Sequence, residues 1–330
     1  QGIGFAIPVK LALEVMKSIV EHGQVIRGWL GIEVQPLSQE LAESFGMKDR
    51  PGIVVAGIFR EGPAAKAGLQ LGGDFTNNMN LQSDTLWLDI GGDFTNLGSL
   101  TGSDVLSISA GDNLINQNLL SGGNVQLNAG GDIINRVEFS QHTVQDGKNS
   151  TTYTTVGKAP QIISTDSLSM TAGNNIDLQG SKFASAGDIS LNAGNDVLLG
   201  AVEKLSGHEK YFKGGHDIEL NRTYDVVSFD AGGNLSVVAG NNLQSEGAVF
   251  AAAGDVELAA GNEMNLLGVV EYHEDLDKRT KKSTFKKTVY IDETYSAEHQ
   301  GSVIVAGGNV SLNAQQSDDG LQLLNSGNVL

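Results

Sequence analysis

The stretch Ser185–Leu199, "SAGDISLNAGNDVLL", determines how most of this chain folds. Ile189 and Leu191 alternate with polar residues, which is the period of a β-strand that buries one face and exposes the other. The run ends at a glycine followed by Asn and Asp, residues that tolerate the positive φ of a tight corner. A strand this short cannot bury its apolar face alone, so the pattern predicts strands that stack on neighbouring copies.

Copies of this unit, a Gly turn followed by Asn or Asp and an apolar residue, recur through the rest of the chain. Asn175 to Asp188 is 13 residues and Asp188 to Asp196 is 8 residues, which together make 21. A period near 20 residues with two sub-units is typical of a solenoid. The fourteen copies lie at residues 72–75, 91–94, 111–114, 122–125, 130–133, 173–176, 187–189, 194–197, 215–218, 232–235, 240–243, 254–256, 261–264 and 307–310.

We therefore predict that residues 71–330 are mainly β and form a right-handed parallel β-helix with about 20 residues per coil. Roughly nine coils, spaced by about 4.8 Å, would make a rod on the order of 45 Å long. Three segments interrupt the period, at residues 136–160, 202–217 and 271–295. Their β-rich ends and polar centres predict hairpins that leave the rod, on the face where solenoids often bind partners.

The charge and composition of the chain exclude several function classes. Its 330 residues hold 21 Lys and Arg against 39 Asp and Glu, a net charge of -18. This balance argues against a nucleic-acid partner and against adsorption to anionic lipid. There is no Cys, which excludes disulfides and thiolate metal sites. We find no apolar run that approaches the roughly 20 residues of a membrane span, and both ends of the sequence suggest a fragment.

The composition changes near residue 70. Residues 1–70 hold seven basic and seven acidic residues, so the later segment carries all of the net charge. Four of the five prolines also precede this point. In the first segment the pattern predicts a helix between Pro8 and Gly23, a strand within residues 27–37, a short helix at 38–47 and a further strand, turn and helical turn within 51–69.

Three motifs in this first segment, "GIGFAIP" (2–8), "RGWLGIEV" (27–34) and "GIVVAGIFREGPAAKAGL" (52–69), resemble the HtrA family of periplasmic serine proteases. The resemblance identifies residues 1–26 as a helix and the end of the protease domain, and residues 27–70 as a truncated α+β PDZ-like segment. It implies that the loop receiving a peptide's C-terminal carboxylate is formed by Trp29, Leu30, Gly31 and Ile32. On the alternative interpretation, Gly31 is merely a turn and Trp29 a packed aromatic.

The same resemblance predicts that the chain is not an enzyme. The family's nucleophile segment does not occur here, so no catalytic triad can be assembled from residues 1–70. The PDZ pattern also stops after "AGLQ", before the helix that forms the second wall of the groove. We interpret the junction near Gln70–Gly73 as a fusion, where the "GD" expected by the first pattern meets the "GGD" of the repeats.

The repeats, through "AGGDI", "SAGDISLNAGNDVLL" and "AGGNVSLNA", resemble the filamentous haemagglutinin and CdiA family of Gram-negative exoproteins. That resemblance implies a secreted, cell-surface stalk of an adhesin or of a contact-dependent inhibition protein. It implies two partners: a receptor or glycan on another cell, and an outer-membrane two-partner-secretion transporter that acts through an N-terminal domain absent here. The alternative function is peptide binding by a periplasmic HtrA-like fragment, whose partners are peptide C-termini.

No catalytic site, metal site or cofactor is predicted. The six histidines form no metal-binding pair, and we interpret them as surface residues. The turn aspartates are expected to accept hydrogen bonds from local backbone N–H groups rather than to do chemistry; they are Asp74, Asp93, Asp132, Asp188, Asp196 and Asp255. The basic cluster "KRTKKSTFKK" (278–287) is expected to be neutralised across its hairpin by flanking acids; these are Glu271, Glu274, Asp275, Asp277, Asp292 and Glu293.

Overall fold

The structure is a computed structural model of the whole chain, and every element with defined bounds in it is a β-strand. It describes residues 73–314 continuously, together with residues 16, 31–36, 53–58, 62, 323–325 and 328–329. The chain divides into two compact units, residues 1–69 and residues 70–330.

In the first unit, two strands form an antiparallel pair. β1 (Ile32–Pro36) pairs with β2 (Ile53–Ile58), so that Ile32 lies opposite Ile58 and Pro36 opposite Ile53. Both strands lie where the sequence predicts strands. The helices predicted at 8–23 and 38–47 lie outside the described residues, apart from Met16.

The second unit contains two parallel sheets, which confirms a mainly β fold. We call the first the narrow sheet. Its strands are β3 (Phe75–Asn77), β5 (Phe94–Asn96), β7 (Leu114–Asn116), β9 (Ile133–Arg136), β13 (Ile176–Gln179), β16 (Val197–Gly200), β21 (Leu243–Glu246), β24 (Met264–Leu267) and β29 (Leu323–Asn325).

The second parallel sheet, the broad sheet, begins with long strands and continues with pairs of short ones. The long strands are β4 (Asn80–Ile90), β6 (Ser99–Ala110), β8 (Leu119–Ala129) and β12 (Gln161–Ala172). The short strands are β14 (Lys182–Ser185), β15 (Ile189–Ala193), β19 (Ser228–Ala231), β20 (Leu235–Ala239), β22 (Val249–Ala252), β23 (Val256–Ala260), β27 (Val303–Ala306), β28 (Val310–Ala314) and β30 (Asn328–Val329).

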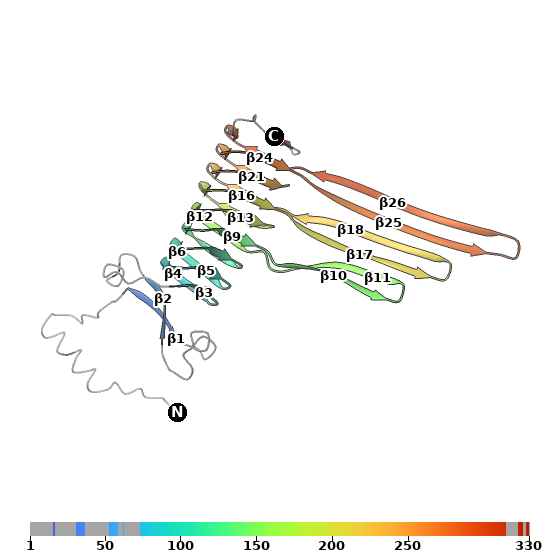
Figure 1. The fold of residues 1–330 in the computed structure, drawn as a ribbon, viewed down its shortest axis with the longest axis horizontal. Helices are drawn as coiled ribbons and strands as arrows, with labels where there is room; N and C mark the ends of the chain where they lie inside the picture. Colours follow the sequence, from blue (N-terminus) through green and yellow to red (C-terminus); the bar gives the residue numbers. More distant parts are fainter. Residues whose placement is uncertain are drawn as a thin grey trace, which may run out of the picture. The chain divides into compact units, whose positions relative to one another are not determined.

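Each strand of these two sheets pairs in parallel with the strand one coil later in the chain. Phe75 lies opposite Phe94, and Leu86 opposite Leu106, so one coil takes 19 or 20 residues there. We call this arrangement the coil stack; it is the stacked series of strands in Figure 1. The alternation predicted from "GDISLNAG" is confirmed, because Ile189, Leu191 and Ala193 are buried and the residues between them are exposed.

Identical side chains stack from coil to coil in the buried interior. The rings of Phe183, Phe229 and Phe250 form one column, with centroids separated by 5.2 Å and then 5.7 Å. All three rings are at most 1% exposed. Stacked aromatic rings at this separation add to the stabilisation that burial itself provides.

The turn residues form hydrogen bonds between coils, which corrects the expectation that they serve local backbone groups. Asp93 Oδ1 accepts from the backbone N of Asn113 at 2.9 Å, and Asn113 Oδ1 accepts from the backbone N of Asp132 at 2.8 Å. A second column begins where Asp188 Oδ1 accepts from the backbone N of Asn234 at 2.7 Å. At the corners of the stack, Asn or Asp therefore follows the glycine because its side chain supports the turn of the next coil. Two of the predicted Gly turns, 122–125 and 215–218, lie inside the strands Leu119–Ala129 and Gly215–Asp225 instead.

A glycine is required at these corners because neighbouring turns approach closely. A Cβ atom built on Gly194 would lie 2.2 Å from the carbonyl oxygen of Gly173 in the preceding coil. Backbone atoms cannot retreat from such a contact as a flexible side chain could. The glycine at these corners is therefore a packing requirement of the stack.

A buried ladder of asparagines runs through the first four strands of the narrow sheet. Asn77 Nδ2 donates to Asn96 Oδ1 at 2.8 Å, Asn96 donates to Asn116 at 2.8 Å, and Asn116 donates to Asn135 at 2.7 Å. The ladder ends at Asn135 because Leu178 occupies the corresponding position of the next coil. Among the described residues, nothing accepts a hydrogen bond from the buried Nδ2 of Asn135.

We predict unequal losses for two substitutions in this ladder. Asn96→Leu removes a donor and an acceptor from the buried row, and should lower the free energy of unfolding by about 1–3 kcal/mol. Asn135→Leu removes the unpaired Nδ2 together with the acceptor of Asn116 Nδ2, which keeps hydrogen bonds to the carbonyl oxygens of Asn118 at 3.2 Å and Gln161 at 3.4 Å, so it should cost less than Asn96→Leu. Urea denaturation of the two variants tests this, and an equal loss in both would contradict the assignment of the ladder's end.

Three antiparallel hairpins leave the coil stack, as the sequence predicts, and the second and third are longer than predicted. They are β10 (Phe139–Asp146) with β11 (Asn149–Val156), β17 (Val202–Phe212) with β18 (Gly215–Asp225), and β25 (Val269–Lys282) with β26 (Lys287–Gln300). Each follows a strand of the narrow sheet, namely β9, β16 or β24, so all three leave from the same corner of the coil.

The hairpins combine into one six-stranded antiparallel sheet, in the order β10-β11-β17-β18-β25-β26. They lie side by side in Figure 1, and we call them the hairpin sheet. The narrow sheet places one strand without a hairpin, β13 or β21, between each pair of hairpin-bearing strands. Hairpins therefore leave two coils apart, about 9.6 Å, which is the width of two paired strands. This match of spacings lets separate insertions form a continuous sheet.

Candidate functional site

The hairpin sheet is the candidate binding site, because it projects from the stack and holds all the exposed aromatic side chains among the described residues. Its strands lengthen from 8 residues in β10 to 11 in β17 and 14 in β25. Three residues of strand span about 10 Å. Successive hairpins therefore extend further from the coil stack, and the third reaches furthest.

One group of side chains joins the second and third hairpins near the middle of the sheet. The Nε of Arg222 lies 3.2 Å from Glu203 Oε2, and its guanidinium lies 4.5 Å from the ring centroid of Tyr272. The hydroxyl of Tyr224 donates to Glu203 at 3.1 Å. Burial and this hydrogen bond to a carboxylate raise the pKa of Tyr224. Glu203, Arg222 and Tyr224 brace the second hairpin, and the stacking of Arg222 on Tyr272 joins it to the third.

A second group stiffens the outer half of the second hairpin. His208 Nε2 lies 2.9 Å from Asp217 Oδ2. Glu209 accepts a 2.6 Å hydrogen bond from the Tyr211 hydroxyl and lies 3.0 Å from His216 Nε2. The Tyr211 hydrogen bond, and then that to His216, lower the pKa of Glu209, while His208 lowers the pKa of Asp217. Both carboxylates are therefore held ionised, the reverse of what a general acid requires.

The lysines at the end of the third hairpin take part in none of the described ion pairs, so the expectation of cross-hairpin neutralisation is wrong. Lys282 lies opposite Lys287, and Lys281 lies opposite Thr288. Among the described ion pairs of this cluster, the one present joins Arg279 to Asp277 on the same strand, at 2.6 Å. The acids face each other nearer the stack, where Asp277 lies opposite Asp292. The register therefore separates the two signs of charge along the hairpin.

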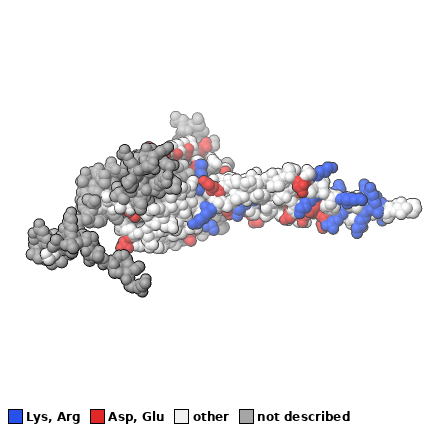
Figure 2. Space-filling view, turned by 90° about the horizontal axis from the view of Figure 1, so that it is seen from below, with Lys and Arg blue, Asp and Glu red and all other residues white. Residues whose placement is uncertain are grey.

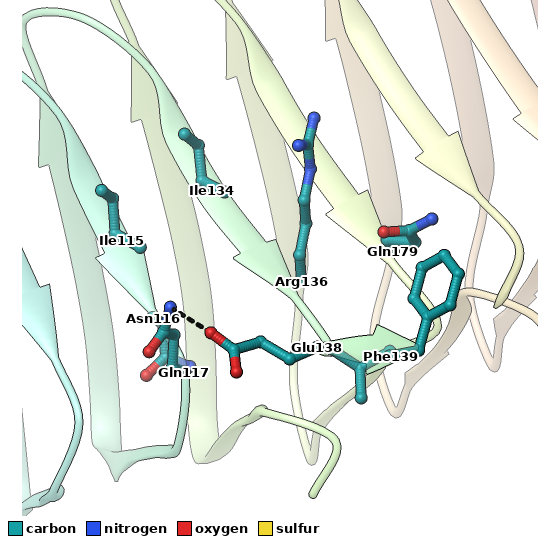
Figure 3. Close-up of a pocket in the computed structure, with 9 residues that line it drawn as sticks. Ile115, Asn116, Gln117, Ile134, Arg136, Glu138, Phe139 and Gln179 are labelled. Carbon is teal, nitrogen blue, oxygen red and sulfur yellow. Dashed lines mark hydrogen bonds between the residues drawn. The ribbon is translucent and has the colours of Figure 1, made fainter. Parts of the chain in front are cut away.

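A surface recess of about 440 Å³ lies where the first hairpin leaves the stack (Figure 3). Ile115 and Ile134 form its apolar wall, and Gln117 Nε2 donates to Glu138 Oε1 at 3.4 Å. Arg136 lies at its edge and pairs with Asp177 of the next coil through a 2.8 Å hydrogen bond from Nε. The carboxylate that lines this recess is that of Glu138, and the rest of the described lining is aliphatic, aromatic, amide or guanidinium, which suits contact with a partner surface.

Of the four residues predicted to receive a peptide carboxylate, the structure describes two. Gly31 is buried, has a φ of 71°, and directly precedes β1. Ile32 begins that strand. Trp29 and Leu30 lie outside the described residues, so carboxylate binding at this loop stays a prediction.

Sequence reasoning missed the joining of the hairpins into one sheet. The signal was present, since two coils separate each interruption of the repeat from the next. It also missed the exposed basic end, because it considered which charges lie near each other in sequence and not the register that pairs them.

No helix among the described residues is long and apolar enough to cross a membrane.

Comparison with known proteins gives two separate similarities. Residues 139–218 match the family model described as a hemagglutinin repeat, which here spans the first hairpin, two coils and part of the second hairpin. The chain is also 46% identical over 81 residues to a probable periplasmic serine endoprotease DegP-like of Pseudomonas putida, covering 24% of this chain and 17% of that protein. A similar relative in Ectopseudomonas mendocina is 50% identical over 72 residues, 22% of this chain and 15% of that protein.

Among solved structures, an HtrA-type protease AlgW with decapeptide is 72% identical, with a TM-score of 0.18, over 21% of each chain. The chain thus spans about a sixth of the length of the curated relatives it matches. Both resemblances seen in the sequence are confirmed. The chain joins a segment similar to HtrA-type periplasmic serine proteases to a segment that carries a hemagglutinin repeat.

Proposed function

We propose that residues 71–330 are a structural segment of a secreted, surface-exposed filamentous haemagglutinin-like adhesin or contact-dependent inhibition protein. The observation that carries this proposal is the hemagglutinin-repeat match at residues 139–218. In this proposal the coil stack is a right-handed parallel β-helix that serves as a stalk, and the hairpin sheet is the surface it presents. A transporter of the two-partner-secretion type exports it, and its partner is a receptor or glycan on another cell.

The construction of the coil stack supports a stalk. Backbone pairing, turn columns and the asparagine ladder all run along one direction, so each coil contacts chiefly the coils beside it. Such a stack can be long and stiff without a large single core. The absence of Cys agrees with export, because no wrong disulfide can form on the way.

A cell-binding assay tests this function. The full chain, labelled with a fluorophore, should bind saturably to bacterial or epithelial cells, and unlabelled chain should compete. A variant in which residues 139–156, 202–225 and 269–300 are each replaced by a short turn should lose this binding while keeping a monomeric elution volume. Binding that is unsaturable, or that is equal in the variant without hairpins, would rule out presentation by the hairpin sheet.

A second candidate function is peptide binding by the PDZ-like segment, supported by the DegP-like similarity and by the position of Gly31 before β1. In this proposal, backbone N–H groups around Gly31 receive a C-terminal carboxylate and β1 or its neighbour accepts an added strand. Fluorescence anisotropy should then give micromolar binding of free-acid peptides that is lost on amidation and in Gly31→Trp. Equal binding of acid and amide peptides would remove this candidate.

A further inference from the structure

The end of the third hairpin extends beyond the rest of the hairpin sheet. The last described contact between this hairpin and its neighbour is a 2.6 Å hydrogen bond from the backbone N of Thr280 to the carbonyl oxygen of Gly214. Residues 281–288, which we call the apex segment, lie past this point. They contain four lysines and no acid.

An aromatic side chain occupies the extreme end of the apex segment. The backbone N of Ser283 donates to the carbonyl oxygen of Lys286 at 2.7 Å, which leaves Thr284 and Phe285 as the two residues of the turn. The side chain of Phe285 is 98% exposed. Figure 2 shows Lys and Arg gathered near the end of the projecting arm, with uncharged residues beyond them at its tip. An apolar tip behind which lysines form a ring is therefore built into the turn.

The acidic remainder of the chain does not cancel the charge of this ring. Lys282 is five positions from Asp277 on β25, and Lys287 is five positions from Asp292 on β26. Five residues of strand span about 17 Å. This is roughly twice the Debye length of about 8 Å at physiological salt. A surface that meets the hairpin end-on is therefore exposed to a local positive charge despite the net charge of -18.

We propose that the apex segment docks end-on onto an anionic lipid surface. Lys281, Lys282, Lys286 and Lys287 lie at the level of the headgroups, and Phe285 enters the boundary between headgroups and acyl chains. The whole-chain charge argues against adsorption of the molecule side-on. The segregation of charge along the hairpin permits adsorption by this one end.

A lipid surface fits these observations better than a long polyanion. A glycan or nucleic-acid strand needs a track of cations along which its charges can lie. Here a polyanionic chain that lay along the hairpin would reach the carboxylates of Asp277 and Asp292 directly after the basic residues. Binding of a polyanion would leave the exposed ring of Phe285 in water, whereas binding to lipid would bury the ring, which is favourable.

The experiment measures partitioning of the full chain onto vesicles by co-sedimentation. Vesicles of phosphatidylcholine that contain about one third phosphatidylglycerol are compared with vesicles of pure phosphatidylcholine, both at physiological salt. Each lysine near an anionic surface contributes about five-fold to the partition coefficient. Replacing both Lys286→Gln and Lys287→Gln should therefore weaken binding to the anionic vesicles by about 25-fold.

Three further variants separate docking by the apex segment from general attraction. Lys158→Gln with Lys182→Gln removes the same charge from exposed positions near the coil stack, far from the apex segment, and should change the partition coefficient by less than about two-fold. Phe285→Ser should weaken partitioning by about ten-fold. Phe285→Trp should retain it, and the emission of the added indole should shift to shorter wavelength when anionic vesicles are present.

Three results would overturn the proposal. One is equal partitioning onto neutral and anionic vesicles. Another is an equal loss in the coil-stack variant and the apex variant, which would indicate diffuse attraction. The third is lysine-dependent binding to heparin or DNA that Phe285→Ser leaves unchanged, combined with no blue shift of Phe285→Trp on vesicles, which would assign the segment to a polyanion.

Discussion

Deleting residues 173–193 should split the hairpin sheet while leaving the coil stack intact. This deletion removes one complete coil, β13 to β15, and joins Ala172 to Gly194 at equivalent positions, since Ala172 pairs with Ala193. The first two hairpins would then leave from adjacent coils, about 4.8 Å apart. Two hairpins that are each about 9.6 Å wide cannot both lie in one sheet at that spacing.

The expected result is the loss of pairing between β11 and β17. Those strands now pair at four positions, from Ser150 opposite Glu209 to Tyr153 opposite Ser206. Cross-strand pairs contribute roughly 0.2–1 kcal/mol each, so amide exchange at residues 150–153 should accelerate by about ten-fold or more. Hydrogen exchange measured by mass spectrometry of peptides from β11 and β17 reports this directly.

A matched control removes a coil from before the first hairpin. Deletion of residues 91–110 joins Ile90 to Gly111, and is again in register because Ile90 pairs with Ala110. It shortens the stack by the same amount and changes no spacing between hairpins. Exchange in β11 and β17 should stay as in the parent chain. If both deletions accelerate exchange equally, the hairpin sheet does not depend on the two-coil spacing.

The substitution Phe229→Ala should give the largest loss of stability from a single residue. Its ring is buried between those of Phe183 and Phe250, so alanine leaves a cavity that neighbouring coils cannot fill. Loss of a buried phenylalanine costs about 3–5 kcal/mol. Many domains have only about 5–15 kcal/mol in total, so the urea midpoint should fall steeply.

Phe139→Ala is the control for that substitution, because Phe139 is a partly exposed residue at the start of the first hairpin. It should change the free energy of unfolding by less than about 0.5 kcal/mol. Because a stack of repeats can unfold in parts, both variants are followed by circular dichroism and by tryptophan fluorescence. A loss for Phe229→Ala no greater than that for Phe139→Ala would mean that the aromatic column does not support the stack.

The parallel stacking could be predicted from sequence because one local rule, alternation after a glycine corner, is repeated many times. The strands around Ile189 and Leu191 need no distant information to specify which face is buried. The positions of the hairpins followed from breaks in the same rule. What could not be predicted was which partner each polar side chain has: Asp188 bonds to Asn234, 46 residues away, because a hairpin intervenes.

The candidate site was harder to predict, since it depends on register. The composition around Lys282 contains nearly balanced charges, and only the pairing of Lys282 with Lys287 shows that they separate along the hairpin. The role of Trp29, Leu30, Gly31 and Ile32 depends on a resemblance alone. A binding loop is defined by the backbone geometry of several residues together, which no single motif specifies.

The spacing of hairpins also limits how such a protein can lengthen in evolution. Since each hairpin occupies the width of two coils, a duplication that contains one hairpin and two coils adds a pair of strands to the sheet without disturbing its neighbours. A duplication that adds coils without a hairpin would separate two hairpins by more than the width of one, and would leave a gap in the sheet. If repeats are inherited in such modules, every new hairpin keeps the two-coil spacing that lets it pair with the hairpin beside it.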